Sequence, residues 1–252
     1  MKVAIVTGGS AGIGAATAKA LAKRGWAVAV NYAHDAAAAE KLAQECGDAI
    51  TVRGDVAQDD DCRRLAAVTM EKLGRIDALV NNAGTTKVVA HHDLEGLSAA
   101  DFQRIFQLNV VAPFQMVRAC SEALKRSRGA VVNVSSVASV LGTGTSVAYA
   151  ASKAALETMS LSLARSLAPE VRVNVVAPGH TNTTWHATVR GPERAAEVEK
   201  RYASIAPLRA ISQAEDVADA IAWLIEGAHN VTGQVIYVDG GMHIAVPSAA
   251  PR

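Results

Sequence analysis

Aromatic residues and cysteines are scarce in this chain, and each scarcity excludes a class of protein. Only 4% of the 252 residues are aromatic, and 3 are cysteines. Cys46, Cys62 and Cys120 are odd in number and widely spaced, which predicts free thiols in a reducing compartment rather than a disulfide framework. No C-x-x-C or mixed Cys/His spacing occurs, and the pair His91-His92 lacks a third ligand, so we predict no metal site.

A charge excess of one sign and long hydrophobic runs are missing too. The chain has 25 basic and 24 acidic residues, which speaks against a nucleic-acid-binding surface or a polybasic membrane segment. No window has the length and apolarity of a membrane span, and the apolar run after Met1 is too short for a signal peptide. We therefore expect a cytoplasmic protein with a small-molecule partner and neither nucleic acid nor membrane.

The chain does have a regular alternation of short apolar runs and helical patterns. The runs predict strands at Val3–Val6, Ala27–Val30, Ala49–Val52, Ile76–Val80, Ala130–Val134, Val171–Val176 and Gln234–Val238. The helical patterns span Gly12–Lys23, Ala36–Cys46, Asp59–Leu73, Phe102–Leu124 with a bend near Pro113, Tyr149 to the residue before Pro169, and Asp216–Ile225.

Several of the predicted strands are apolar throughout, as in a parallel sheet whose two faces are both covered by helices. The alternation therefore predicts one α/β domain over residues 1–252: a doubly wound, Rossmann-type, mostly parallel sheet of about seven strands with helices on both faces. The stretch 180–206 has no predicted strand and is the irregular part of the pattern. We expect it to form a mobile lid over the substrate.

A glycine-rich turn, Thr7-Gly8-Gly9-Ser10-Ala11-Gly12-Ile13-Gly14, joins the first strand to the first helix. Glycines allow a tight turn and let backbone N–H groups at the positive end of a helix approach a pyrophosphate. The spacing is G-x-x-x-G-x-G rather than the G-x-G-x-x-G of the familiar dinucleotide fingerprint. A plain strand–helix turn is the alternative interpretation.

Tyr149 and Lys153 have the i, i+4 spacing that places two side chains on one face of a helix, and Ser136 precedes them. A tyrosine hydroxyl has a pKa of about 10, and a neighbouring cation lowers it. With a serine hydroxyl holding a substrate oxygen, such a pair can give or take a proton at an alcohol or carbonyl oxygen. Taken alone, the same spacing is typical of a packing or surface pair.

The ordered set of motifs resembles the short-chain dehydrogenase/reductase family from about Lys2 to Gly241. The matching segments are T-G-G-S-A-G-I-G, N-N-A-G, Asn109, Ser136, Tyr149, Lys153, Pro178-Gly179 and V-D-G-G. Within the family, the chain looks most like 3-oxoacyl-acyl-carrier-protein reductases and members similar to sugar dehydrogenases. The glycine spacing differs from that of the extended, epimerase-like members.

The resemblance implies catalytic roles for four residues. Tyr149 is the expected acid/base, and Lys153 binds the nicotinamide ribose and depresses the tyrosine pKa. Ser136, rather than Ser135, matches the catalytic serine, and Asn109 holds a water in a proton relay. The implied cofactor-binding residues, in addition to Tyr149 and Lys153, are Gly8, Ser10, Gly12, Ile13, Gly14, Asp55, Val56, Asn82, Ala83, Gly84, Pro178, Gly179, Thr181 and Thr183.

The end of the second strand bears on the choice between NADP and NAD. An acidic residue there hydrogen-bonds the free ribose 2′-hydroxyl of NAD and repels a 2′-phosphate. Tyr32 stands where NAD-preferring relatives have Asp, which favours NADP, although Ala11 and Ala33 occupy positions where arginines often bind the phosphate. His34 and Ser10 are the candidates to contact it. NAD remains possible.

The expected activity is hydride transfer between NAD(P) and a carbonyl or secondary alcohol, with a 3-oxoacyl compound or another ketone as substrate. Alternatives are a sugar or other secondary-alcohol dehydrogenase, and a nucleotide-binding sensor without chemistry. The predicted substrate pocket combines 85–93, 141–147 and 180–206, and nothing in these stretches demands a charged substrate. Relatives are often tetramers, so the resemblance implies a homotetramer.

Overall fold

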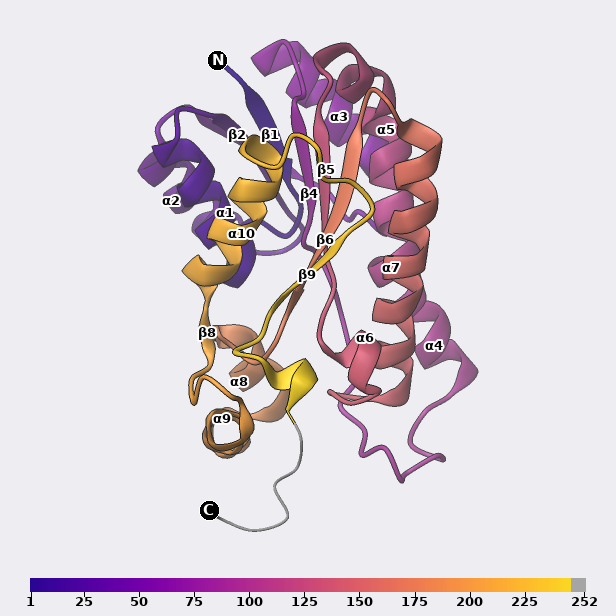
Figure 1. Ribbon diagram of the computed structural model, residues 1–252. Helices are drawn as coiled ribbons and strands as arrows, with labels where there is room; N and C mark the ends of the chain where they lie inside the picture. The colour runs from indigo at the N-terminus through magenta and orange to yellow at the C-terminus, as the bar shows by residue number, and fades with distance from the viewer. Residues whose placement is uncertain (246–252) are drawn as a thin grey trace.

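The computed structural model describes residues 1–245, which form one central sheet with helices on both sides (Figure 1). The sheet contains seven strands: β1 (Val3–Val6), β2 (Ala27–Tyr32), β3 (Ala49–Arg53), β4 (Ala78–Asn81), β5 (Ala130–Val134), β6 (Arg172–Pro178) and β9 (Val235–Val238). All neighbours pair in parallel, in the order β3-β2-β1-β4-β5-β6-β9. This arrangement confirms the predicted doubly wound fold.

The strand order reverses direction between β1 and β4, which are neighbours in the sheet. The chain runs from β1 outward to β3 on one side and then from β4 outward to β9 on the other. The loops after β1 and β4 therefore diverge to opposite faces and leave a crevice at the carboxyl ends of these strands. Ligands of open α/β sheets bind at such a position.

Three helices cover each face of the sheet. On one face, α1 (Gly12–Lys23), α2 (Ala36–Cys46) and α10 (Ala214–Glu226) bury Leu21, Ala39 and Ile221 against strand residues such as Val28. On the other, α3 (Asp59–Leu73), α5 (Ala112–Ser127) and α7 (Val147–Leu167) bury Leu65, Met116 and Ala164. Each of these six helices follows an amphipathic or alanine-rich stretch, so the hydrophobic pattern accounts for its position.

The helix predicted over 102–124 is irregular near Pro113, but Pro113 is not the cause. A helix α4 (Ala99–Phe106) continues into a π-helical turn over Gln107–Val111, and α5 begins at Ala112. The proline lies in the first turn of α5, where its missing N–H breaks no helical hydrogen bond. The irregularity is thus a wider turn upstream of Pro113, and it includes the buried Asn109.

The expectation of an irregular 180–206 segment without a strand is wrong. The two-residue strand β7 (Thr181–Asn182) pairs with β8 (Ser212–Gln213), and the segment then forms α8 (Thr184–Arg190) and α9 (Pro192–Ile205). Gly191, with φ of 82°, separates the two helices, and Pro192 starts the second. The two remaining elements are short: α6 (Ala138–Leu141) and the 3-10 turn Met242–Ile244.

Residues 1–245 lack two further kinds of feature. Among residues 1–245, no helix combines the length and apolarity needed to cross a bilayer. The same part of the chain has no group of three or more His, Cys, Asp or Glu side chains arranged to hold a metal ion. All three cysteines are free thiols.

Candidate active site

A cleft of about 1430 Å³ lies at the carboxyl ends of the strands, where the strand order reverses. Its walls come from the glycine turn after β1, the N-N-A-G loop after β4, the loop after β5, the start of α7, and the α8–α9 segment. A cleft of this size and position has room for a dinucleotide and a small substrate.

The glycine turn is fixed in place by the loop after β4. The Thr7 hydroxyl accepts hydrogen bonds from the backbone N–H groups of Asn82 and Ala83, and the Asn82 amide donates to the carbonyls of Thr7 and Gly8 at 3.0 Å each. Gly8 has φ of 58°, and a Cβ there would lie 3.0 Å from the Ala83 Cα. Both the conformation and the close approach therefore require glycine at this position.

The N-terminus of α1 is built to receive an anion. Ala11 occupies the N-cap position and offers no side-chain acceptor, and the first turn contains no acidic residue. Gly12, with φ of 52°, faces Thr183 across the cleft, where a Cβ would lie 3.4 Å from the Thr183 methyl carbon. Uncapped N–H groups at the positive end of a helix, beside a gap kept open by glycine, fit the pyrophosphate of a dinucleotide.

Tyr149 projects into the cleft from the first turn of α7. The Ser146 side chain caps this helix by accepting from the Tyr149 backbone N–H at 3.3 Å. The Tyr149 side chain is half-buried and lines the cleft. Burial raises the pKa of its phenol, while a hydrogen bond with Ser136 acts in the opposite direction. The phenol is therefore protonated near neutral pH.

Lys153 is buried one turn further along α7, with 5% of its surface exposed. Its Nζ donates to the Val134 carbonyl at 2.8 Å and lies 5.7 Å from the centre of the Tyr149 ring. Burial lowers the pKa of Lys153 to about 8, against an opposing effect of Glu157. The expected depression of the Tyr149 pKa is not found: burial of the phenol outweighs the other influences and raises it.

The two serines after β5 have separate environments. Ser135 is buried, and its hydroxyl donates to Glu157 at 2.7 Å and to the Lys153 carbonyl at 3.2 Å, so it joins β5 to α7. The Ser136 hydroxyl accepts from the Ala138 backbone N–H at 3.2 Å and remains able to donate toward Tyr149 or a ligand. The geometry thus supports the choice of Ser136 over Ser135.

Asn109 does not line the cleft but lies directly behind it, in the π-helical turn. Its side-chain amide donates to Ser152 Oγ at 2.9 Å and to the Thr85 carbonyl at 3.0 Å, and its Oδ1 accepts from the Thr85 N–H at 2.8 Å. A Cβ at Gly84 would lie 3.4 Å from that oxygen and 3.7 Å from Lys153 Nζ. Asn109 therefore holds the loop after β4 against α7, close to the buried lysine.

Most of the other predicted cofactor residues do line the cleft. These are Gly8, Gly12, Ile13, His34, Asp55, Val56, Asn82, Ala83, Gly84, Pro178, Gly179, Thr181 and Thr183. Gly14 acts through packing, because a Cβ there would lie 2.4 Å from the Gly8 carbonyl oxygen. Ser10 does not line the cleft, and Tyr32 packs against the core formed with α1, α2 and α10. The Tyr32 side chain follows Val28 and Val30 on that face of β2, which explains why it turns away.

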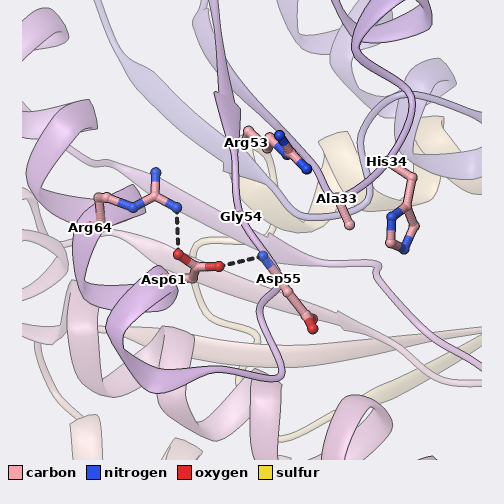
Figure 2. Close-up of a pocket in the computed structure, with 7 residues that line it drawn as sticks. All are labelled: Ala33, His34, Arg53, Gly54, Asp55, Asp61 and Arg64. Atoms are coloured by element: carbon pink, nitrogen blue, oxygen red, sulfur yellow. Dashed lines mark hydrogen bonds and ion pairs between the residues drawn. The ribbon is translucent and has the colours of Figure 1, made fainter.

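Arg53 is a candidate cofactor residue that sequence reasoning missed. It pairs in register with Tyr32 and lines a recess of about 440 Å³ with Ala33 and His34. Figure 2 shows its guanidinium directed toward Ala33 and His34, while Arg64 turns away to bond Asp61. Arg53 forms no ion pair within 4 Å among the described residues, although its charge helps to lower the pKa of Asp61, which lines the same recess. The sequence signal that could have identified Arg53 was its position at the end of the third strand. That strand end and the end of the second strand lie at the same edge of the sheet.

The low pKa of Lys153 predicts how stability changes with pH. The folded chain releases this proton near pH 8, whereas the unfolded chain holds it to about its ordinary value of 10.5. Between these pH values the unfolded state binds more protons, so this group increases the free energy of unfolding as pH rises. The total increase is on the order of 3 kcal/mol. Urea unfolding of the wild type and of Lys153→Met is measured from pH 7 to 10.5. The free energy of unfolding of the wild type should rise relative to that of the variant as pH rises. Curves that stay parallel over this range would contradict a buried Lys153 with a lowered pKa.

Comparisons with known proteins agree with this geometry. Residues 8–243 match a family model described as enoyl-(acyl carrier protein) reductase. A Streptomyces violaceoruber protein assigned as ketoacyl reductase 2 of the granaticin polyketide synthase is 40% identical, with 96% of each chain covered.

Two solved structures are similar over almost the whole chain. A crystal structure assigned as a short-chain dehydrogenase/reductase of Burkholderia xenovorans has a TM-score of 0.90 and 37% identity, covering 97% of this chain and 99% of that one. The ligand-free aldohexose dehydrogenase of Thermoplasma acidophilum has a TM-score of 0.86 and 30% identity, covering 100% and 97%. The chain therefore belongs to the short-chain dehydrogenase/reductase family, whose members are NAD(P)-dependent oxidoreductases acting on CH–OH or carbonyl groups.

Proposed function

We propose that this protein is an NADPH-dependent ketone reductase in which Tyr149 protonates the carbonyl oxygen. The observation that supports it most is the joint position of three groups: the Tyr149 phenol, the Ser136 hydroxyl and the buried Lys153 ammonium meet beside a cleft that fits a dinucleotide. The bound nicotinamide supplies the hydride. The single domain 1–252 provides the proton and the positions of the reactants.

The protein residues have distinct parts in this reaction. Ser136 and Tyr149 donate hydrogen bonds to the substrate oxygen as negative charge develops on it, and Tyr149 then gives up its proton. Lys153 stabilises the resulting phenolate by its charge. Asn109 holds the loop after β4 against α7 behind these groups through its side-chain amide. The family resemblance assigns to it the relay water.

The protonation state of Tyr149 in the unliganded protein suits ketone reduction. Its raised pKa keeps the phenol protonated near neutral pH, and a protonated phenol is the form that donates to a ketone. Oxidation of a sugar or another secondary alcohol uses the same residues in reverse, and the similarity to an aldohexose dehydrogenase makes it the second candidate. It requires the phenolate before hydride transfer, which burial disfavours.

The preference for NADPH is supported by the recess around Arg53. Arg53 and His34 can face a ribose 2′-phosphate there, and a guanidinium binds phosphate with strong, charge-assisted hydrogen bonds. Arg64 is occupied by Asp61, so it contributes charge rather than a free donor fork. Asp55 lies in the same recess, but its carboxylate already accepts from the Ala57 N–H at 3.0 Å.

The test is consumption of NADPH and NADH with 3-oxo esters, cyclic ketones and steroid ketones, and formation of NADPH and NADH with aldohexoses and secondary alcohols. Ketone reduction with NADPH at a higher kcat/KM than any oxidation supports the proposal. Faster aldohexose oxidation favours the second candidate. Tight dinucleotide binding without turnover of any compound would indicate a nucleotide-binding sensor.

We also propose that the protein assembles as a homotetramer through α5 and α7. Large apolar side chains stay exposed on these helices in the single chain, including Phe114 at 43% and Leu161 at 41%. Exposed apolar groups on neighbouring helices are typical of a subunit interface. Light scattering coupled to gel filtration measures the mass, and a monomer at micromolar concentration would contradict the proposal.

A further inference from the structure

Four arginines line the cleft near its substrate end, and two of them have no acidic partner among the described residues. Arg190 and Arg194 reach it from the α8–α9 segment, Arg201 follows on α9, and Arg104 faces them from α4. Asp55 is the one acidic residue among the described residues that line the cleft, and it lies at the adenosine end. An excess of one sign of charge inside a cleft attracts ligands of the opposite sign.

The four arginines differ in what already satisfies them. Arg194 pairs with Glu197 at 2.6 Å and is 68% exposed at its side chain. Arg104 lies 3.8 Å from Asp101 and donates to the Thr85 hydroxyl. Arg201 is exposed to solvent. Arg190 alone of these combines partial burial with the lack of an acidic partner in residues 1–245.

Arg190 has a buried N–H group that nothing in the described chain uses. Its Nη2 donates to the Gly144 carbonyl at 3.3 Å, but its Nε is buried without a hydrogen-bond partner among residues 1–245. Burial, with a smaller effect of Arg194, lowers the pKa of this guanidinium. A charged donor left buried and unpaired is costly, and an anion bound in fork geometry would relieve that cost.

The Arg190 guanidinium and the proposed proton donor, Tyr149, both contact Gly144. The Gly144 whose carbonyl Arg190 contacts packs on Tyr149: a Cβ at Gly144 would lie 3.5 Å from the Tyr149 ring. From the other end of α8, the Trp185 ring lies 6.1 Å from the Tyr149 ring, centre to centre. Helix α8 thus covers the reacting position with an aromatic ring at its start and a cation at its end.

We propose that the substrate is an anionic ketone, and that Arg190 binds its carboxylate or phosphate while Tyr149 and Ser136 meet its carbonyl oxygen. The proposal rests on the proposed reductase function and adds the substrate class to it. Because the cation lies close to Tyr149, the anionic group is a few bonds from the reacting carbonyl rather than at the end of a long chain.

Matched substrate pairs that differ in charge test this directly. Acetoacetate is compared with methyl acetoacetate for the carboxylate, and dihydroxyacetone phosphate with dihydroxyacetone for the phosphate. With the wild type, at least one anion is expected to exceed its neutral partner in kcat/KM by about tenfold or more, the range of a charge-assisted hydrogen bond. Whichever pair shows the ratio identifies the anion.

Arg190→Gln is expected to bring that ratio to about one, and Arg190→Lys to restore part of it, because lysine keeps the charge and loses the fork. Lys72→Gln, at an exposed lysine of α3 outside the cleft and outside the proposed interface, makes the same charge change and is the matched control. It should keep the wild-type ratio. The dissociation constant for NADPH, followed by fluorescence, shows that each variant is folded.

Binding of the four compounds to the NADP-loaded protein, measured by calorimetry, separates the two hypotheses. Anion binding that Arg190→Gln removes, without turnover, would refute the reductase function and leave the anion site standing. Turnover in which neutral ketones match or exceed the anions would overturn the anion site and leave the reductase intact. Loss of the ratio in Lys72→Gln as well as Arg190→Gln would also overturn it, since net charge rather than Arg190 would then be responsible.

Discussion

Tyr149→Phe is expected to lower kcat for ketone reduction by about 10²- to 10⁴-fold, the usual contribution of a positioned general acid. The variant keeps the ring that packs beside Gly144 and Trp185 and loses the hydroxyl that hydrogen-bonds with Ser136. The fold and the glycine turn are untouched, so the dissociation constant for NADPH should stay within about twofold. Stopped-flow single turnovers with saturating NADPH measure the chemical step itself.

A second tyrosine provides the control for this experiment. Tyr237 lies on β9, stacks on His243 with ring centres 4.3 Å apart, and is not part of the cleft wall. Tyr237→Phe removes the same single oxygen and should retain the wild-type kcat. If Tyr149→Phe kept more than about a tenth of the wild-type kcat, Tyr149 would not be the general acid.

Arg53→Asp is expected to reverse the cofactor preference. The substitution removes a guanidinium that can bind the 2′-phosphate and places a carboxylate at an edge where acids select the free 2′-hydroxyl. The ratio of dissociation constants, NADH over NADPH, should fall by about 10²-fold or more, since an attraction of ion-pair strength becomes a repulsion. Calorimetric titration with each nucleotide measures this ratio without any substrate.

Two further variants make this result specific to Arg53. Arg53→Lys keeps a positive charge and should lose only part of the preference for NADPH. Lys72→Asp makes the same charge reversal on the exposed surface of α3, away from the recess and the proposed interface, and should leave the ratio unchanged. A wild-type protein that binds NADH more tightly than NADPH would contradict the role given to Arg53.

The sequence allowed accurate prediction where local pattern decides structure. The bounds of α1, α2 and α3 and of β1 and β5 agree with the predicted ones, because each lies between clear helix or turn signals. The choice of Ser136 over Ser135 stays a prediction, because only activity measurements test which serine takes part in catalysis. Tertiary partners distinguish these two neighbouring serines. The choice between them therefore came from the family resemblance and not from the residues alone.

Other features depend on contacts between distant segments, which a pattern does not reveal. Helix α9 has no buried residue, so it contributes nothing to the core pattern by which the other helices were predicted. Tyr32 turns to the core because the register of β2 sets its face. The pKa of Tyr149 rises because burial outweighs the hydrogen bond with Ser136, and burial is a property of the whole fold. The buried Nε of Arg190, which lacks a hydrogen-bond partner in the described chain, likewise depends on neighbours in space that the sequence does not reveal.

The π-helical turn Gln107–Val111 has a consequence for how this chain tolerates changes in length. A π-turn holds more residues than an α-turn, so removing one residue there would let α4 and α5 join as a continuous α-helix. Each residue of an α-helix advances about 100° around the axis, so everything upstream would rotate by that angle relative to α5. Asn109 would then leave Thr85 and Ser152. A single-codon deletion in this turn would thus misalign the active site, even though it removes only one residue from the chain.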